Sequence, residues 1–237
     1  MRLALSEPRY QTALIIGAGS GLSAALARAF GKAGMRIALA ARSTDDLGPL
    51  CREVSGQAFP CDASKRADVE ALFGAVDAAL GSPDVVLYNA SFRTRGAFIE
   101  LDPTDVEKTL AITAFGGFLV AREAARRMLL NHHGAILFTG ASASVKGYAQ
   151  SAPFAMGKFA LRGLAQSLAR ELSPQGIHVA HFVIDGGIRS ARRPDPEDNP
   201  DSLLDPDAIA ASYLHVLKQP RNAWSWEIEL RPWVERF

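Results

Sequence analysis

The chain has 237 residues, 48% of them hydrophobic, which is enough apolar material for one large α/β domain. Its 26 basic and 25 acidic residues leave a net charge of +1, a balance that argues against a nucleic-acid or membrane partner. Two cysteines, Cys51 and Cys61, are too few for a disulfide framework. Neither a signal peptide at Met1 to Gln11 nor a bilayer-spanning run is evident, so we expect a soluble cytoplasmic protein.

Short apolar runs alternate with longer helical stretches along the chain. The runs predicted as strands are Ala13–Ile16, Arg36–Ala40, Gln57–Pro60, Asp84–Tyr88, Ala135–Thr139, His178–Ile184 and Trp226–Leu230. Apolar spacing and glycine or proline stop signals predict helices over Leu22–Phe30, Asp68–Leu80, Thr104–Leu130 and Pro153–Leu172. Strands joined by helices of this length predict an α/β fold of Rossmann type, a doubly wound, mostly parallel sheet with helices on both faces.

One segment, Arg189 to Asp207, is rich in proline and aspartate and lacks a predicted element. We expect it to be a mobile, lid-like loop at about 189–207, over one end of the sheet. Ligands of parallel sheets bind outside the carboxyl ends of the strands, where a lid would be useful. No linker or internal repeat divides the chain, so we expect a single domain over residues 1–237.

A glycine-rich turn follows the first predicted strand and leads straight into a helix. Its candidate cofactor-binding residues are Gly17, Gly19, Ser20, Gly21 and Leu22. Glycines let the backbone approach a pyrophosphate, and a helix N-terminus supplies free amides and a favourable dipole. A flexible glycine loop is the alternative, but a strand, a glycine turn and a helix in this order predict dinucleotide binding.

The second predicted strand ends in Ala40-Ala41-Arg42-Ser43, with no acidic residue before Asp45. An acidic side chain at this place would bond the ribose hydroxyls of NAD, whereas an arginine can meet the 2′-phosphate of NADP. We therefore expect NADP(H) as the cofactor, with NAD(H) less favoured. The alternative interpretation of Arg42 is a solvated surface arginine.

These features and several later segments resemble the short-chain dehydrogenase/reductase family over nearly the whole chain. Gly17-x-x-x-Gly21-x-Ser23 is similar to the family's glycine motif, with serine as its last residue. Further similar segments follow in family order: Cys61-Asp62-Ala63, Tyr88-Asn89-Ala90-Ser91, Phe154-Ala155-Met156-Gly157-Lys158 and Asp185-Gly186-Gly187-Ile188. The resemblance implies cofactor contacts from Asp62 (to the adenine), Ala63, Asn89, Ala90, Lys158 (to the nicotinamide ribose) and Ile188 (to the carboxamide).

The resemblance also implies a hydride-transfer site of which only one part is present. In the family a tyrosine transfers the proton, a serine holds the substrate oxygen, an asparagine completes a relay and a lysine lowers the tyrosine pKa. Only the lysine is retained, as Lys158; Phe154, Ala141 and Thr113 stand at the other three positions, which suggests an atypical branch. Because a general acid raises rates by roughly 10²- to 10⁴-fold, its loss predicts weak reduction of ordinary ketones.

Three hydroxyl side chains are candidate substitutes: Ser142 and Ser144, just after Ala141, and Tyr148, six residues before Phe154. Turn, cap or packing roles are their alternatives. Two hypotheses remain. The protein is an NADP(H)-dependent oxidoreductase acting on a carbonyl or alcohol small molecule, with a proton from Tyr148, a serine such as Ser142, or water. Alternatively, it is a dinucleotide-binding module with weak or no catalysis, serving as a sensor, scaffold or partner subunit. The family resemblance favours the enzyme.

The remaining expectations concern metals and assembly. No cluster of Cys, His and Asp has metal-ligand spacing, so we expect no metal. The long helices Thr104–Leu130 and Pro153–Leu172 carry more apolar residues than one sheet face needs, and their equivalents in the family pair between subunits. We therefore expect a homodimer or homotetramer that binds a small-molecule substrate, with no nucleic-acid partner and no membrane.

Overall fold

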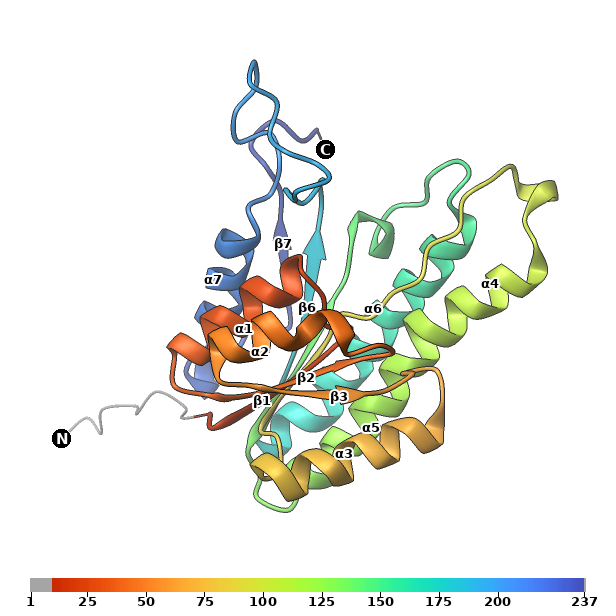
Figure 1. The fold of residues 1–237 in the computed structure, drawn as a ribbon. Coiled ribbons are helices and arrows are strands. Elements are labelled where there is room, and N and C mark those ends of the chain that lie inside the picture. Colours follow the sequence, from red (N-terminus) through yellow and green to blue (C-terminus); the bar gives the residue numbers. More distant parts are fainter. Residues whose placement is uncertain (1–9, 237) are drawn as a thin grey trace.

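The structure, a computed structural model, describes residues 10–236. Most of the segment Met1–Gln11 considered above therefore lies outside the described residues. The sheet described over this range has seven parallel strands in the order β3-β2-β1-β4-β5-β6-β7 (Figure 1). The strands are β1 (Thr12–Ile16), β2 (Arg36–Ala41), β3 (Gln57–Pro60), β4 (Val85–Tyr88), β5 (Gly134–Thr139), β6 (Ile177–Ile184) and β7 (Glu227–Leu230). The predicted doubly wound fold is confirmed, and each predicted strand boundary is right to within one residue.

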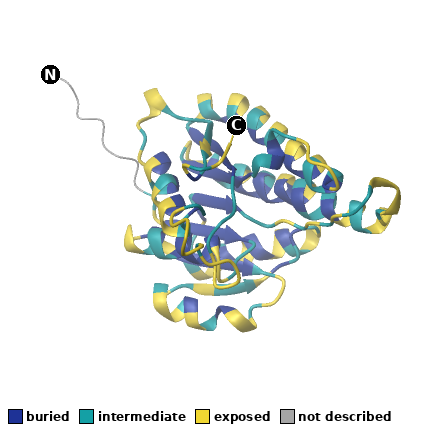
Figure 2. Ribbon diagram, turned by 90° about the horizontal axis from the view of Figure 1, so that it is seen from above, coloured by how far each residue is buried: buried dark blue, intermediate teal, exposed yellow. Residues whose placement is uncertain are grey.

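Helices cover both faces of the sheet, which is buried between them (Figure 2). On one face lie α1 (Leu22–Lys32), α2 (Gly48–Val54) and α7 (Pro206–Leu217). On the other lie α3 (Arg66–Leu80), α5 (Gly116–Met128) and α6 (Ala152–Leu172). Alternate strand residues serve the two cores: Ile15 belongs to the first and Leu14 to the second. Burial on both faces explains why the strands are continuous apolar runs.

The predicted helix Thr104–Leu130 differs from the structure in one respect. It consists of α4 (Pro103–Leu110), a π-helical turn at Ala111–Phe115 and then α5. The buried Tyr88, at the end of β4, donates its hydroxyl hydrogen to the carbonyl oxygen of Ile112 within the π turn. The turn thus presents an acceptor to a side chain that would otherwise be a buried, unpaired hydroxyl.

The predicted loop Arg189–Asp207 is shorter than expected, because its last two residues belong to α7. The carboxylate of Asp205 caps this helix by accepting a hydrogen bond of 2.7 Å from the Asp207 amide. The segment between β6 and α7 is held by internal ion pairs, which Arg189 forms with Asp195 and Asp205. Helices α2 and α7 were not predicted.

The two halves of the sheet are joined at the centre through Asp84, just before β4. Its carboxylate accepts hydrogen bonds from the amides of Gln11 and Thr12, with a shortest distance of 2.8 Å. The start of β1 is thereby held against a residue 72 positions further along the chain. Strand order reverses between β1 and β4, so this junction is also where a ligand cleft is expected.

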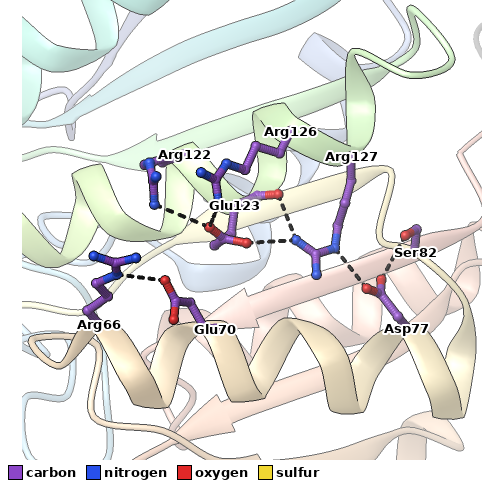
Figure 3. A network of polar contacts seen from close by, with 8 residues as sticks. All are labelled: Arg66, Glu70, Asp77, Ser82, Arg122, Glu123, Arg126 and Arg127. Carbon is purple, nitrogen blue, oxygen red and sulfur yellow. Dashed lines mark hydrogen bonds and ion pairs between the residues drawn. The ribbon is translucent and has the colours of Figure 1, made fainter.

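Helices α3 and α5 are joined by a network of charged side chains (Figure 3). The nearly buried carboxylate of Glu123 receives Arg126 at 2.9 Å and Arg127 at 3.0 Å. Arg127 also donates to Asp77 of α3 at 2.8 Å.

No helix among residues 10–236 is long and apolar enough to cross a membrane.

Candidate cofactor and active site

The glycine turn between β1 and α1 has a shape that only glycine allows at its first position. Gly17 has a φ of +83°, and a Cβ atom there would lie 2.5 Å from the amide nitrogen of Ala90. By contrast, a Cβ atom on Gly19 or Gly21 would meet nothing within 4 Å. The turn is therefore tightly packed behind and open in front, which fits the close approach of a pyrophosphate to its backbone.

Ser23 fastens this turn to the end of β4. Its buried hydroxyl donates to the carbonyl oxygen of Gly17 at 2.8 Å and accepts from Nδ2 of Asn89 at 2.7 Å. The sequence alone identified Ser23 only as a replacement for a glycine, and it identified Asn89 as a cofactor contact. The structure joins the two residues in one hydrogen-bonded chain that fixes the turn relative to the sheet.

A cavity of about 620 Å³ opens in front of the turn, at the carboxyl ends of β1, β2 and β4. Six of the predicted cofactor-binding residues line it: Gly17, Arg42, Asp62, Ala63, Asn89 and Ala90. Sequence reasoning did not assign the other polar or aromatic lining residues Ser43, Ser91 and Phe92. Ser43 and Ser91 directly follow Arg42 and Ala90, so the strand ends were an available signal for them.

A second cavity, of about 580 Å³, lies between the start of α1 and the segment after β6. Ser20 and Gly21 line it from one side, and Arg189 and Ser190 line it from the other. Of the other predicted cofactor contacts, Leu22 is buried in the core and Ile188 pairs with Leu204 through an isolated bridge. Eight of the twelve predicted cofactor-binding residues therefore line these two cavities, whereas Gly19, Leu22, Lys158 and Ile188 line neither.

The wall of the first cavity carries opposite charges on Asp62 and Arg42. Ser64 donates to Oδ1 of Asp62 from its hydroxyl at 2.7 Å and from its amide at 3.1 Å. The hydroxyl bond is the largest cause of a lowered pKa for Asp62, and the nearby charges of Lys65 and Arg42 lower it further. Asp62 is thus held as a carboxylate, able to accept a hydrogen bond from an amino group.

Lys158 and Phe154 lie one turn apart on α6. The ammonium of Lys158 is buried and donates to the carbonyl oxygen of Thr139 at 2.7 Å. Burial lowers the pKa of Lys158 to about 8. Its Nζ atom lies 5.9 Å from the centroid of the Phe154 ring. A cation therefore stands next to the ring, but the ring has no proton to transfer.

The predicted substitutes are not brought together with Lys158. The buried Ser144 hydroxyl accepts a hydrogen bond of 3.1 Å from the Ala141 amide, a role within its own turn. Tyr148 is 45% exposed. Within residues 10–236, no hydrogen bond joins Ser142, Ser144 or Tyr148 to Lys158. Ser142 and Tyr148 thus remain predicted proton donors that no hydrogen bond among the described residues links to Lys158.

Thr113, at the position assigned to the asparagine, is buried within the π turn. Its Oγ1 atom lies 3.4 Å from the amide of Phe92, which donates to it. A Cβ atom on Gly157 would lie 3.0 Å from Cβ of Thr113, so the glycine before Lys158 allows α6 to approach the turn closely. Thr113 thus contributes packing and one backbone contact at the site.

One residue beside the site had no signal in the sequence. The guanidinium carbon of Arg93 lies 4.8 Å from the centroid of the Phe154 ring, a cation–π contact. Arg93 follows β4 in a polar segment without periodicity, and only the fold brings it to α6.

Within the part of the chain that is described, no group of three His, Cys, Asp or Glu side chains could hold a metal ion.

The model of the short chain dehydrogenase family matches residues 11–195. D-threitol dehydrogenase of Mycolicibacterium smegmatis is 31% identical over 174 residues, which cover 71% of this chain and 67% of that protein. Short chain aldehyde dehydrogenase 1 of Euphorbia lathyris is 31% identical over 181 residues, which cover 71% of this chain. The match spans only 61% of the length of that relative.

Solved structures extend the similarity over the whole fold. A short-chain dehydrogenase from Rhodopseudomonas palustris has a TM-score of 0.81 and 35% identity, covering 95% of this chain and 100% of that chain. A metagenomic short-chain oxidoreductase in complex with NADP has a TM-score of 0.82 and 27% identity, covering 94% of this chain and 97% of that chain. The chain belongs to the short-chain dehydrogenase family, and the predicted family membership is confirmed.

Proposed function

We propose that this protein is an NADP(H)-dependent oxidoreductase that interconverts a carbonyl compound and an alcohol. The observation that carries the proposal is the cavity at the β1–β4 junction, with an open glycine turn on one side and Arg42 on the other. A similar solved structure binds NADP, which supports the same cofactor here. Bound NADPH would supply the hydride.

The residues of this chain divide the binding of the dinucleotide among them. We assign the pyrophosphate to the backbone from Gly17 to Leu22 and the 2′-phosphate to Arg42. Asp62 is assigned to the adenine amino group, because its carboxylate is held ionised. Lys158 is assigned to the nicotinamide ribose and Ile188 to the carboxamide. Asn89, besides its bond to Ser23, and Ala90 would form the wall behind the cofactor.

Proton transfer is the weak part of this site. Phe154 carries no ionisable hydrogen, so the proton must come from Ser142, Tyr148 or water. None of these is held by Lys158 in the manner of an activated phenol. A general acid raises the rate of such a reaction by roughly 10²- to 10⁴-fold. We therefore expect the turnover of simple ketones to be slower by this factor than in an enzyme that has the acid.

The choice of cofactor is tested by replacing the arginine that distinguishes the two dinucleotides. Fluorescence titration should show that the wild type binds NADPH at least about tenfold more tightly than NADH, a difference of ~1.4 kcal/mol. Arg42→Asp should remove or reverse the preference, because a carboxylate repels the 2′-phosphate. Arg52→Asp, an exposed site on α2 outside the cavity, is the matched control. Equal affinities that Arg42→Asp leaves unchanged would overturn the NADP assignment.

A second candidate function is a dinucleotide-binding module with little or no catalysis, acting as a sensor, scaffold or partner subunit. What supports it is the sequence resemblance, which assigns Phe154, Ala141 and Thr113 to the positions of the family's proton-transfer residues. NADPH binding without oxidation of NADPH across a broad carbonyl panel would favour this function over the enzyme.

The thiols bear on where the protein acts. Cys51 and Cys61 are both unpaired, and burial raises the pKa of Cys61 to about 12. Free, unreactive thiols are typical of a reducing compartment. We therefore propose that the protein acts in the cytoplasm. The cavity beside the glycine turn supports a small-molecule substrate, and the net charge of +1 favours no nucleic-acid partner.

A further inference from the structure

The segment that follows β4 brings two arginines to the start of α6. Arg93 stacks on Phe154, with its guanidinium carbon 4.8 Å from the ring centroid, and Arg95 follows two residues later. Both side chains are exposed to solvent. A guanidinium over an aromatic ring leaves N–H groups available to donate to a planar or tetrahedral anion.

The backbone of this segment is fixed at both ends. The amide of Phe92 donates to Oγ1 of Thr113 at 3.4 Å, and the amide of Gly96 donates to the carbonyl oxygen of Gln150 at 3.2 Å. Arg93 is therefore held between the π turn and the loop that precedes α6. Its position over Phe154 follows from the backbone as well as from the stacking contact.

A third guanidinium comes from the segment after β6. A Cβ atom built on Gly187 would lie 2.6 Å from Nη1 of Arg193, so this side chain lies against the turn that precedes Ile188. Partial loss of solvent around the exposed Arg93 lowers its pKa, and the positive charges of Arg95 and Arg193 lower it further. The charge of Arg93 thus interacts with those of Arg95 and Arg193, although Arg193 comes from a distant part of the chain.

These charges are not neutralised by the protein. Within residues 10–236, none of Arg93, Arg95 and Arg193 forms an ion pair with a carboxylate. Arg189, in the same segment as Arg193, differs because it is paired with both Asp195 and Asp205. Three unpaired guanidiniums repel one another and are stabilised together by a bound anion.

We propose that Arg93, assisted by Arg95 and Arg193, binds an anionic group of the substrate, with the Phe154 ring as the platform that holds Arg93. The substrate class is then a carbonyl or hydroxy compound that bears a carboxylate or a phosphate. This inference rests on the proposed oxidoreductase function, because it concerns the same site. It gives Phe154 a positive role: an apolar ring at this position supports a recognition arginine.

The test compares carbonyl compounds that share a carbon skeleton but differ in whether they carry a negative charge. Calorimetric titration of the NADP⁺-loaded protein avoids turnover, and benzoylformate and its neutral methyl ester are a matched pair. We expect benzoylformate to bind at least tenfold more tightly than the ester. Dihydroxyacetone phosphate and dihydroxyacetone form the second pair, which shows whether phosphate or carboxylate is the better ligand.

Variants locate the binding to this cluster. Arg93→Gln should weaken the binding of the charged compounds at least tenfold and leave the neutral ones unchanged. Phe154→Leu should weaken it at least threefold by removing the platform, and Arg193→Gln should also weaken it. Arg192→Gln, next to Arg193 in the chain but without a contact to Arg93, is the control for a general loss of positive charge.

The outcomes separate this inference from the proposed function. Equal binding of charged and neutral compounds, or equal effects of Arg93→Gln and Arg192→Gln, would overturn the anion site. Oxidation of NADPH with neutral carbonyls alone would keep the proposed function and overturn the inference. Anion binding that depends on Arg93, in a protein with no affinity for NADP⁺ or NADPH, would keep the anion site and overturn the proposed function.

Discussion

Phe154 keeps the ring of a tyrosine but lacks its hydroxyl, and Lys158 stands one helical turn away with Nζ 5.9 Å from the ring centroid. In Phe154→Tyr this ammonium should lower the pKa of the new phenol. Ala141→Ser should add a second hydrogen bond to a carbonyl oxygen. We expect the double variant to gain at least about tenfold in NADPH-dependent reduction of activated ketones or diketones, or ~1.4 kcal/mol of barrier.

The measurement follows NADPH absorbance for the wild type, both single variants and the double variant. Normal NADPH binding by a double variant that converts no compound in the panel would contradict a carbonyl-shaped pocket. A wild type that is already fast, and is slowed by Phe154→Tyr, would show that the site uses different chemistry. In that case Phe154 is not a lost acid.

A second prediction concerns Lys158, because burying its ammonium lowers the stability of the protein without cofactor. Its pKa falls from the ordinary 10.5 to about 8 on folding. Between these values the unfolded chain binds the extra proton and the native chain does not, so stability rises with pH. Relative to Lys158→Met, the wild type should gain about 3 kcal/mol of unfolding free energy between pH 7 and 11, measured in urea.

Groups that titrate in both proteins, such as the buried tyrosines, cancel in this comparison. Lys218→Met, at an exposed lysine, is the control for losing a lysine from the chain. A difference between wild type and Lys158→Met that stays constant over the pH range would argue against a buried ammonium.

At the scale of elements, the charged network between α3 and α5 contains a matched pair of carboxylates (Figure 3). Glu123 has 9% of its side chain exposed and accepts from two arginines, whereas Glu70 forms one exposed pair with Arg66. Glu123→Gln should lower the unfolding free energy by about 1–3 kcal/mol, because it leaves Arg126 without a counterion and leaves Arg127 with Asp77 alone. Glu70→Gln should change it little. Equal effects in thermal or urea unfolding would contradict this account.

The elements also show what the sequence could predict. Burial on both faces makes each strand a continuous apolar run, which is why β1 and β4 were recognised. Helix α7 had an available signal as well: a capping Asp205-Pro206 precedes Ile209 and Tyr213, which are buried at helical spacing. The loop predicted at Arg189–Asp207 included this cap, so the start of the helix was missed. The π turn had no signal, because one added residue per turn leaves composition and periodicity almost unchanged.

The site was predicted where it depends on local order and missed where it depends on distant contacts. The glycine turn and Arg42 each directly follow a strand, so they could be assigned from the sequence. The bond between Ser23 and Asn89, and the stacking of Arg93 on Phe154, join residues more than about sixty positions apart, which no local pattern encodes.

At the scale of the whole molecule, exposed apolar side chains gather on the helices that were expected to pair. Phe115 and Phe118, stacked at 6.1 Å, are 51% and 45% exposed, and Phe159 on α6 is 45% exposed. We propose that these helices pair two subunits into a homodimer or a dimer of dimers. Light scattering at micromolar concentration should give at least twice the mass of one chain.

Phe118→Asp should shift this assembly toward the monomer by placing a charge in the apolar contact. Leu130→Asp, at an exposed leucine beyond the end of α5, is the control and should leave the mass unchanged. A wild type of monomer mass would contradict the proposal.

The hydrogen bonds from Gln11 and Thr12 to Asp84 bear on the order in which the nascent chain folds. We expect β1 to pair first with β2, because β4 follows only after residue 84 and β1 takes β4 on its other edge. The strands β5, β6 and β7 each pair with the strand that precedes them in the chain, so this half of the sheet can grow in the order of synthesis. We therefore expect strands β1–β4, around the glycine turn, to assemble before α6, with Phe154 and Lys158, has been translated.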